Sequence, residues 1–178
     1  MEGKFFQISD VLGIDKECGI SLGKDKYNIE KLEGHFILDG INDPIDYGED
    51  KKNIYALEDT NVLDIVFSDR FIRKVNVGEV MLAANNYGKG RGVYIAGLPY
   101  SPQNARLLLR AMYWSAGKEQ EMFKAFSSNI NTDCSYYPET KKYAIINNAN
   151  APQTTTFYNV DGKAEELTLD AGAIIWKE

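Results

Sequence analysis

Glycines alternate with basic side chains in segment 88–92, which reads Gly-Lys-Gly-Arg-Gly, a composition found in loops that hold phosphate. A phosphate loop works when glycines lead directly into a helix, because the free N–H groups at the helix N-terminus then meet the anion. Here the apolar run 93–96 follows, so the glycines are predicted to connect two strands. The strand-to-helix junction, 97–102, contains two prolines, which lack N–H donors. We therefore predict a turn, with Lys89 and Arg91 directed to solvent or to a neighbouring domain.

Cysteine and histidine, the residues of nucleophilic and metal chemistry, are scarce. The chain has two cysteines, Cys18 and Cys134, and one histidine, His35. A catalytic pair of Cys18 and His35 is disfavoured, because Cys18 has glycine on one side only and no clear strand leads into it. A zinc site would need more ligands than these. With no disulfide framework indicated, we expect a reducing cytoplasm.

Acidic residues are plentiful, with 26 Asp and Glu against 20 Lys and Arg and a net charge of −6. This balance argues against a nucleic-acid partner. In segment 39–50 proline and glycine disrupt the spacing of a calcium loop, so we expect a solvated acidic loop. The other acids fall beside turns and strand ends, and sequence alone places no two of them at the roughly 6.5–9.5 Å that inverting sugar cleavage requires. They include Glu58, Asp59, Asp64, Asp69 and Glu79.

Aromatic side chains are frequent in the last part of the chain, and they allow two interpretations. Alternation along strands usually buries such residues in a core, which is the favoured interpretation. A sugar-stacking surface is the alternative. The residues are Tyr136, Tyr137, Tyr143, Phe157, Tyr158 and Trp176.

The elements that would position these groups change character near residue 118. Before it, strand patterns mix with helical ones. Strands are predicted at 35–38, 54–57, 62–67, 80–85 and 93–98, and a helix at 5–15 with Gly13 as its stop. The apolar runs are too short for a membrane helix, and the N-terminus lacks the pattern of a signal peptide.

The clearest helix pattern begins after Ser101, whose side chain can cap the helix, with Pro102 at the first helical position. Gly117 is predicted to end it. Strand, loop and helix in this order predict an α/β layer in which the helix packs on the sheet. The apolar stripe that we expect to face the sheet consists of Ala105, Leu108, Leu109 and Met112, widened by Tyr113.

Short strands and tight turns dominate residues 119–178. After a short helix at 121–126, strands are predicted at 133–137, 143–147, 154–159, 165–169 and 173–176. Hairpin residues connect them, such as Asp161-Gly162. The predicted fold class is α/β plus all-β, with an antiparallel module of sandwich type in this second region.

Several stretches together resemble the C-terminal portion of the 1,3-β-galactosyl-N-acetylhexosamine phosphorylases, also called galacto-N-biose/lacto-N-biose phosphorylases. The resemblance covers nearly the whole chain in order, and segment 87–117 is its most specific part. The stretches are FFQISDVLGIDKECGISLGKDKYN, GHFILDG, KKNIYALEDTNVL, YGKGRGVYIAGLPYSPQNARLLLRAMYWSAG, FSSNIN and NNANAPQTTTFYNVDGKAEELTLDAGAIIWKE.

The resemblance implies an inverting enzyme in which phosphate attacks the anomeric carbon of β-1,3-linked galactose. The products are α-galactose 1-phosphate and an N-acetylhexosamine. A related subfamily acts on a galactosyl-β-1,4-rhamnose bond. In such enzymes the general acid and the phosphate-binding residues lie on an N-terminal (β/α)-barrel, which a glutamine-amidotransferase-like α/β domain and a C-terminal β-sandwich follow.

None of the matching stretches contains a catalytic residue of the family, so no catalytic, cofactor or metal site is carried over. We expect residues 1–118 to be part of the amidotransferase-like domain and residues 119–178 to be the β-sandwich. The chain is then a non-catalytic segment whose partner is the upstream barrel, with a homodimer also allowed and neither nucleic acid nor membrane involved. The alternative is a free-standing carbohydrate-binding or assembly module. An amidotransferase-like cysteine enzyme would need a nucleophile elbow that the sequence lacks.

Overall fold

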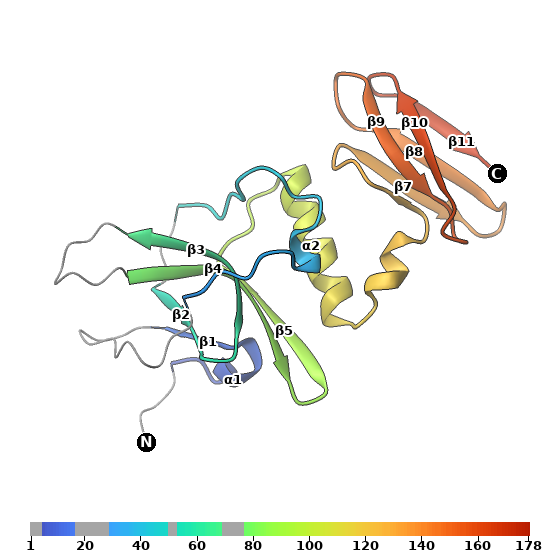
Figure 1. Cartoon of the computed structure of the whole chain (residues 1–178). Helices are drawn as coiled ribbons and strands as arrows, with labels where there is room; N and C mark the ends of the chain where they lie inside the picture. Colours follow the sequence, from blue (N-terminus) through green and yellow to red (C-terminus); the bar gives the residue numbers. More distant parts are fainter. Residues whose placement is uncertain (1–4, 17–28, 50–52, 69–76) are drawn as a thin grey trace.

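The protein is β-rich and built mainly of small antiparallel sheets (Figure 1). The computed structural model describes residues 5–16, 29–49, 53–68 and 77–178. Within these residues no helix has the length and apolar character needed to cross a membrane. The helical elements are α1 (Ser9–Leu12), η2 (Phe36–Leu38), α2 (Pro102–Ser115) and η3 (Glu119–Phe123), where η denotes a 3₁₀ helix. The strands are β1 (Ile14–Lys16), β2 (Ile54–Ala56), β3 (Asn61–Ser68), β4 (Val77–Tyr87), β5 (Gly90–Ile95), β6 (Phe126–Ser127), β7 (Thr132–Tyr137), β8 (Lys142–Asn147), β9 (Gln153–Tyr158), β10 (Ala164–Leu169) and β11 (Ile174–Lys177).

The described residues before 118, which we call the N-terminal region, are organised around the antiparallel sheet β3-β4-β5. Helix α2 and η2 cover one face of this sheet, while α1, β1 and β2 lie against the other (Figure 1). Apolar side chains of β4 point to both faces, Leu82 into the cluster with α2 and Val80 into the cluster with β1 and β2. Burial on both sides explains why this strand is so rich in apolar residues.

Helix α2 begins and ends where the sequence predicts. The Ser101 side chain accepts a hydrogen bond from the Asn104 amide (3.0 Å), Pro102 occupies the first turn, and Gly117 follows the helix with a φ of 66°. The predicted apolar stripe, however, faces the wrong way: Leu108 is 41%, Leu109 38% and Met112 62% exposed. The residues buried instead are Asn104, Arg106, Leu107, Arg110, Ala111 and Trp114.

The error has a physical cause. Leu107, Ala111 and Trp114 also lie at helical spacing, so α2 has two apolar stripes, and a pattern alone does not choose between them. Two further expectations near the N-terminus were also wrong in part. The helix expected at 5–15 is the single turn α1, because Gly13 adopts a φ of 69° and the chain then continues as β1. Segment 35–38 forms the 3₁₀ turn η2 rather than a strand.

The β module, which we define as strands β6 to β11, consists of two three-stranded antiparallel sheets, β10-β9-β6 and β11-β8-β7. Side chains from both sheets share one core that contains Ile145 of β8, Phe157 of β9 and Leu169 of β10. The predicted strands are confirmed to within one or two residues, and the short helix expected at 121–126 is the earlier turn η3. Alternation of more and less buried residues explains the agreement for β7 and β9.

Candidate functional site

The glycine segment 88–92 forms the turn and the first residues of the β4–β5 hairpin (Figure 1). Tyr87 pairs with Gly90, which leaves Gly88 and Lys89 as a two-residue turn. Gly88 has a φ of 58°, a conformation that favours glycine in such turns. The turn prediction is confirmed: the chain continues from the turn directly into strand β5, so no helix N-terminus is available there for phosphate.

Gly92 is explained by packing rather than by ligand binding. A Cβ atom added at this position would come within 2.5 Å of the Val11 carbonyl oxygen, so only glycine lets α1 lie against β5. On the neighbouring strand, Asn85 Nδ2 donates to the carbonyl oxygens of Asp10 (2.8 Å) and Val11 (3.1 Å). These bonds satisfy carbonyls at the end of a helix too short to satisfy its own.

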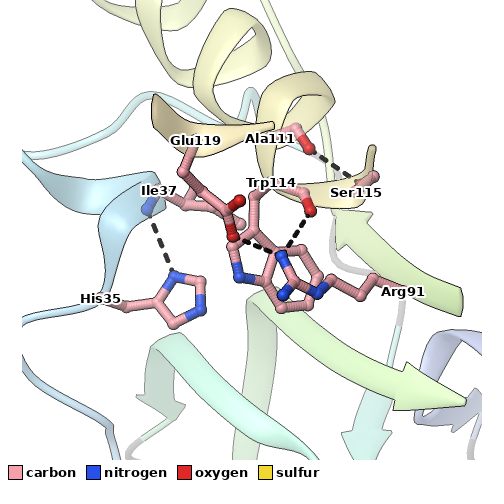
Figure 2. A network of polar contacts seen from close by, with 7 residues as sticks. All are labelled: His35, Ile37, Arg91, Ala111, Trp114, Ser115 and Glu119. Atoms are coloured by element: carbon pink, nitrogen blue, oxygen red, sulfur yellow. Dashed lines mark hydrogen bonds and ion pairs between the residues drawn. The ribbon is translucent and has the colours of Figure 1, made fainter. Parts of the chain in front are cut away.

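Arg91 turns back toward the end of α2 while remaining partly exposed (Figure 2). Its Nη1 donates to the Trp114 carbonyl oxygen (2.9 Å) and to the Glu119 carboxylate, and its guanidinium lies 5.0 Å from the centre of the Trp114 ring. A guanidinium at this distance combines ion pairing with attraction to the aromatic ring. Arg91 therefore joins the hairpin to α2 and η3 within this chain.

His35 contacts the same tryptophan from a different segment (Figure 2). Its ring centre lies 5.2 Å from that of Trp114, and its Nδ1 accepts a hydrogen bond from the Ile37 amide (3.2 Å). Burial and the nearby charge of Arg91 lower the pKa of His35, while Asp39 and Glu119 oppose this shift. A neutral imidazole fits the geometry, because only an unprotonated Nδ1 can accept the Ile37 hydrogen bond.

These four side chains, Arg91, Trp114, His35 and Glu119, form what we call the Trp114 cluster. The pKa of Glu119 is lowered, first by a hydrogen bond from its own backbone amide and then by Arg91, so its carboxylate is charged near neutral pH. The cluster holds an acid, a base and a cation, yet each is paired with another member or with backbone. The hydrogen bonds, ion pair and ring contacts of the cluster therefore hold four segments of the chain together.

The Cys18–His35 pair, which the sequence disfavours, is not tested by the structure, because Cys18 lies outside the described residues. Cys134 lies in β7 and is half-buried, and burial together with Asp133 raises its pKa to about 11, which keeps the thiol protonated and unreactive. Among the described residues no three His, Cys, Asp or Glu side chains come together in a way that could hold a metal ion.

The described acidic residues that the sequence analysis considered are either exposed to solvent or paired with a neighbouring group. Asp43, Asp46 and Glu49 of the acidic loop are exposed, and Asp50 lies outside the described residues. Asp64 pairs with Lys31 (3.2 Å), whereas Glu79 accepts from the Asn53 amide (3.0 Å). Glu58 and Asp59 are exposed at the turn before β3, and Asp69 lies outside the described residues. The solvated-loop prediction is confirmed for the acids that are described.

The aromatic residues of the β module divide into core and surface. Tyr143 and Phe157 are buried and Tyr136 packs against them, as the core interpretation predicts. Tyr137 and Trp176 are different: they are 46% and 60% exposed, with ring centres 5.5 Å apart on the outer face of the sheet β11-β8-β7.

A buried polar face of α2, which the sequence analysis missed, joins the N-terminal region to the β module. Arg106 Nη2 donates to the carbonyl oxygens of Ser127 (3.0 Å) and Asn129 (3.3 Å), and its guanidinium lies 4.5 Å from the Phe126 ring centre. One turn later, Arg110 Nη1 donates to the Phe36 carbonyl oxygen (3.0 Å). The available signal was two arginines four residues apart in an otherwise uncharged helix.

A polar groove of about 310 Å³ lies beside this junction. Gln103 Nε2 donates to the carbonyl oxygens of Asp43 and Pro44 (3.1 Å each), and Asn129 Nδ2 donates to the Thr154 carbonyl oxygen (3.0 Å). The Gln103 and Asn129 amides of the groove are therefore already used in holding the loops together. The groove is lined by Gly40, Asn42, Asp43, Gln103, Ser128, Asn129 and Ile130.

Comparison with known proteins gives two family matches that divide the chain. The family described as lacto-N-biose phosphorylase central domain matches residues 1–120, and the lacto-N-biose phosphorylase C-terminal domain matches residues 126–177.

Curated relatives match the chain over almost all of its length. The 1,3-beta-galactosyl-N-acetylhexosamine phosphorylase Cphy0577 of Lachnoclostridium phytofermentans is 43% identical over 177 residues, which are 99% of this chain and 23% of that protein. The 1,3-beta-galactosyl-N-acetylhexosamine phosphorylase of Bifidobacterium longum is 34% identical over an alignment of 206 positions, which covers 99% of this chain and 26% of that protein. A D-galactosyl-beta-1->4-L-rhamnose phosphorylase of Lachnoclostridium phytofermentans is 26% identical over 85% of the chain. The chain thus spans about a quarter of the length of the first two relatives and 19% of the third.

Proposed function

The chain belongs to the lacto-N-biose phosphorylase family, and from this membership we propose that it is the non-catalytic C-terminal portion of an inverting phosphorylase. The enzyme in question cleaves galactosyl-β-1,3-N-acetylhexosamine with phosphate to give α-galactose 1-phosphate. The role of this segment is structural: it supports an upstream (β/α)-barrel that carries the chemistry and takes part in assembly. The proposal places the protein in the cytoplasm, where the unpaired Cys134 would remain reduced.

One observation carries the proposal: relatives named as phosphorylases match 99% of this chain but devote only 23–26% of their own length to the match. The remaining three-quarters have ample room for a catalytic domain. The polar side chains of the segment support the same view, because Arg91, Glu119 and Arg106 all have partners inside the chain.

The domain organisation is part of the proposal. We assign residues 1–118 to a partial amidotransferase-like α/β domain, in support of which α2 packs on one face of the sheet β3-β4-β5. We assign residues 119–178 to a C-terminal β-sandwich, in support of which two three-stranded sheets share one core.

The test is an assay of phosphorolysis. The purified 178-residue chain is incubated with galactosyl-β-1,3-N-acetylglucosamine and phosphate, and α-galactose 1-phosphate is measured, with Cphy0577 as the positive control. The proposal predicts product from the control and none from the chain. Turnover by the chain alone would show that its chemistry lies within these residues.

A second function, carbohydrate binding by the β module, is favoured by the exposed ring pair of Tyr137 and Trp176. Paired aromatic faces on a sheet suit the apolar faces of pyranose rings. The chain is titrated with galactosides while tryptophan fluorescence is followed, and the Trp176→Phe variant removes the reporter on this surface. Carbohydrate binding predicts a saturable change that Trp176→Phe abolishes; constant emission would leave the structural role alone.

A further inference from the structure

We propose that the outer face of α2, which consists of Ala105, Leu108, Leu109 and Met112, docks against the part of the phosphorylase that lies outside this segment. All four residues are exposed in the structure. The inference rests on the proposed function and adds to it the surface through which the segment meets the rest of the enzyme.

Helix α2 buries its charged residues and exposes apolar ones. Its two charged residues, Arg106 and Arg110, are only 9% and 5% exposed, whereas Met112 is 62% exposed. Guanidinium groups normally remain in water and apolar side chains leave it. Both arginines are held by backbone carbonyls of β6 and η2, so the rotation of the helix about its axis is fixed by bonds inside the chain. The outer face cannot turn inward without breaking them.

The spacing on this face is that of a helix that fits a groove. Residues 105, 108, 109 and 112 follow the i, i+3, i+4, i+7 pattern of anchors that enter an apolar groove. No charge interrupts the face, and the inner face with Leu107, Ala111 and Trp114 is already packed on the sheet. A helix that is apolar on both sides is typical of the interior of a larger protein.

The small size of this outer face indicates what kind of protein surface covers it. Four residues are far fewer than the roughly 20–30 a side that a stable interface between separate proteins uses. A surface within the same polypeptide needs less, because chain connection supplies a high effective concentration. The relatives have such additional chain, since the match covers only 23% of Cphy0577. The rest of the enzyme therefore fits this face better than a second copy does.

The experiment measures burial of the face directly. A chimera is made in which this chain replaces the 177 matched residues of full-length Cphy0577. Met112→Cys is introduced into both the 178-residue chain and the chimera, with Leu109→Cys as a second variant. Ile174→Cys, at a position of similar exposure (57%) on the β module, is the matched control. Maleimide labelling rates of each cysteine are determined by peptide mass spectrometry, which separates them from native thiols.

We expect Met112→Cys and Leu109→Cys to react at least tenfold more slowly in the chimera than in the 178-residue chain, with Ile174→Cys less affected. Equal rates in the two proteins would overturn the inference and leave the proposed function standing. Slow, concentration-dependent labelling in the isolated chain would also overturn it, because a second copy would then cover the face. Failure of the proposed function would be seen in a different experiment, as phosphorolysis by the isolated chain.

Discussion

The two regions of this protein contain similar kinds of side chains but differ in how completely they bury them. In the β module two sheets close on one core that contains Tyr143, Ile145 and Phe157, and the large apolar side chains left exposed are Tyr137, Ile174 and Trp176 of one sheet. In the N-terminal region both faces of the sheet β3-β4-β5 are covered, yet α2 keeps a second apolar face in solvent. The difference teaches that one region can close its own core while a helix of the neighbouring region keeps an apolar face available for contact with another protein surface.

The largest expected effect tests whether the β module has a core of its own. Phe157→Ala removes a ring that is 5% exposed and should lower the free energy of unfolding of the module by about 3–5 kcal/mol. Each region has one of the two tryptophans, so in a Trp176→Phe background Trp114 reports on the N-terminal region while far-UV circular dichroism reports on both. Tyr137→Ala, which truncates an exposed ring, is the control.

Phe157→Ala should move the dichroism transition to lower urea and leave most of the Trp114 transition in place. Equal shifts of both signals would show that the two regions do not unfold separately, because the Arg106 contacts would then join them into one cooperative unit.

A second prediction compares the two faces of α2. Leu107→Ala removes a fully buried side chain and should cost about 2–5 kcal/mol of stability, whereas Leu109→Ala, at a position 38% exposed, should cost less than about 1 kcal/mol. Both substitutions remove the same atoms from the same helix, so propensity cancels. Urea unfolding of the 178-residue chain measures the difference, and comparable losses would show that the outer face is packed after all.

These two faces also show what the sequence could and could not predict. Strands of the β module follow from a period of two, because a half-buried sheet has one dry face and one wet face. Helix α2 follows from Ser101, Pro102 and Gly117, which act locally. Which of its stripes faces the sheet depends on Arg106 and Arg110 meeting carbonyls far along the chain, and no local pattern contains that information.

The candidate site divides in the same way. That segment 88–92 is a turn follows from the strand after it, and the structure confirms this. That Arg91 folds back onto Trp114 while Lys89 remains exposed depends on where the end of α2 lies relative to the hairpin. The prediction directed both basic residues to solvent or to a neighbouring domain; Arg91 does remain partly exposed and pairs with Glu119, but its contact with Trp114 of α2 was not predicted.

A third, smaller effect separates these two basic residues. Arg91→Ala loses a charged hydrogen bond to the Trp114 carbonyl, the ion pair with Glu119 and the stacking on the indole, and should cost about 1–2 kcal/mol because the site is partly exposed. Lys89→Ala, at the exposed turn, should change stability by less than about 0.5 kcal/mol. Thermal unfolding at low and high salt measures both. Equal losses of stability in the two variants would show that Arg91 does not hold the hairpin to α2.

The smallest effect depends on pH and concerns His35. Its pKa is lowered in the folded protein, chiefly by burial and then by Arg91, while its unfolded value is about 6.5. Well above pH 6.5 both states are neutral and His35 adds no pH dependence. As the pH falls below that value, the unfolded chain takes up a proton first, so stability decreases until the pH passes below the folded pKa.

His35→Asn tests this prediction with little change in structure. Asn can accept the Ile37 amide hydrogen bond in place of Nδ1, and it is a good capping residue, but it does not titrate. The free energy of unfolding of the two proteins is measured between about pH 5 and pH 8, and the variant should lose less stability on acidification. Glu119 titrates at lower pH, because its pKa is also lowered, and so does not produce the same signal. If both proteins lost stability equally over this range, the proton uptake would belong to other groups, and the Trp114 cluster would accommodate a charged His35 in the folded state.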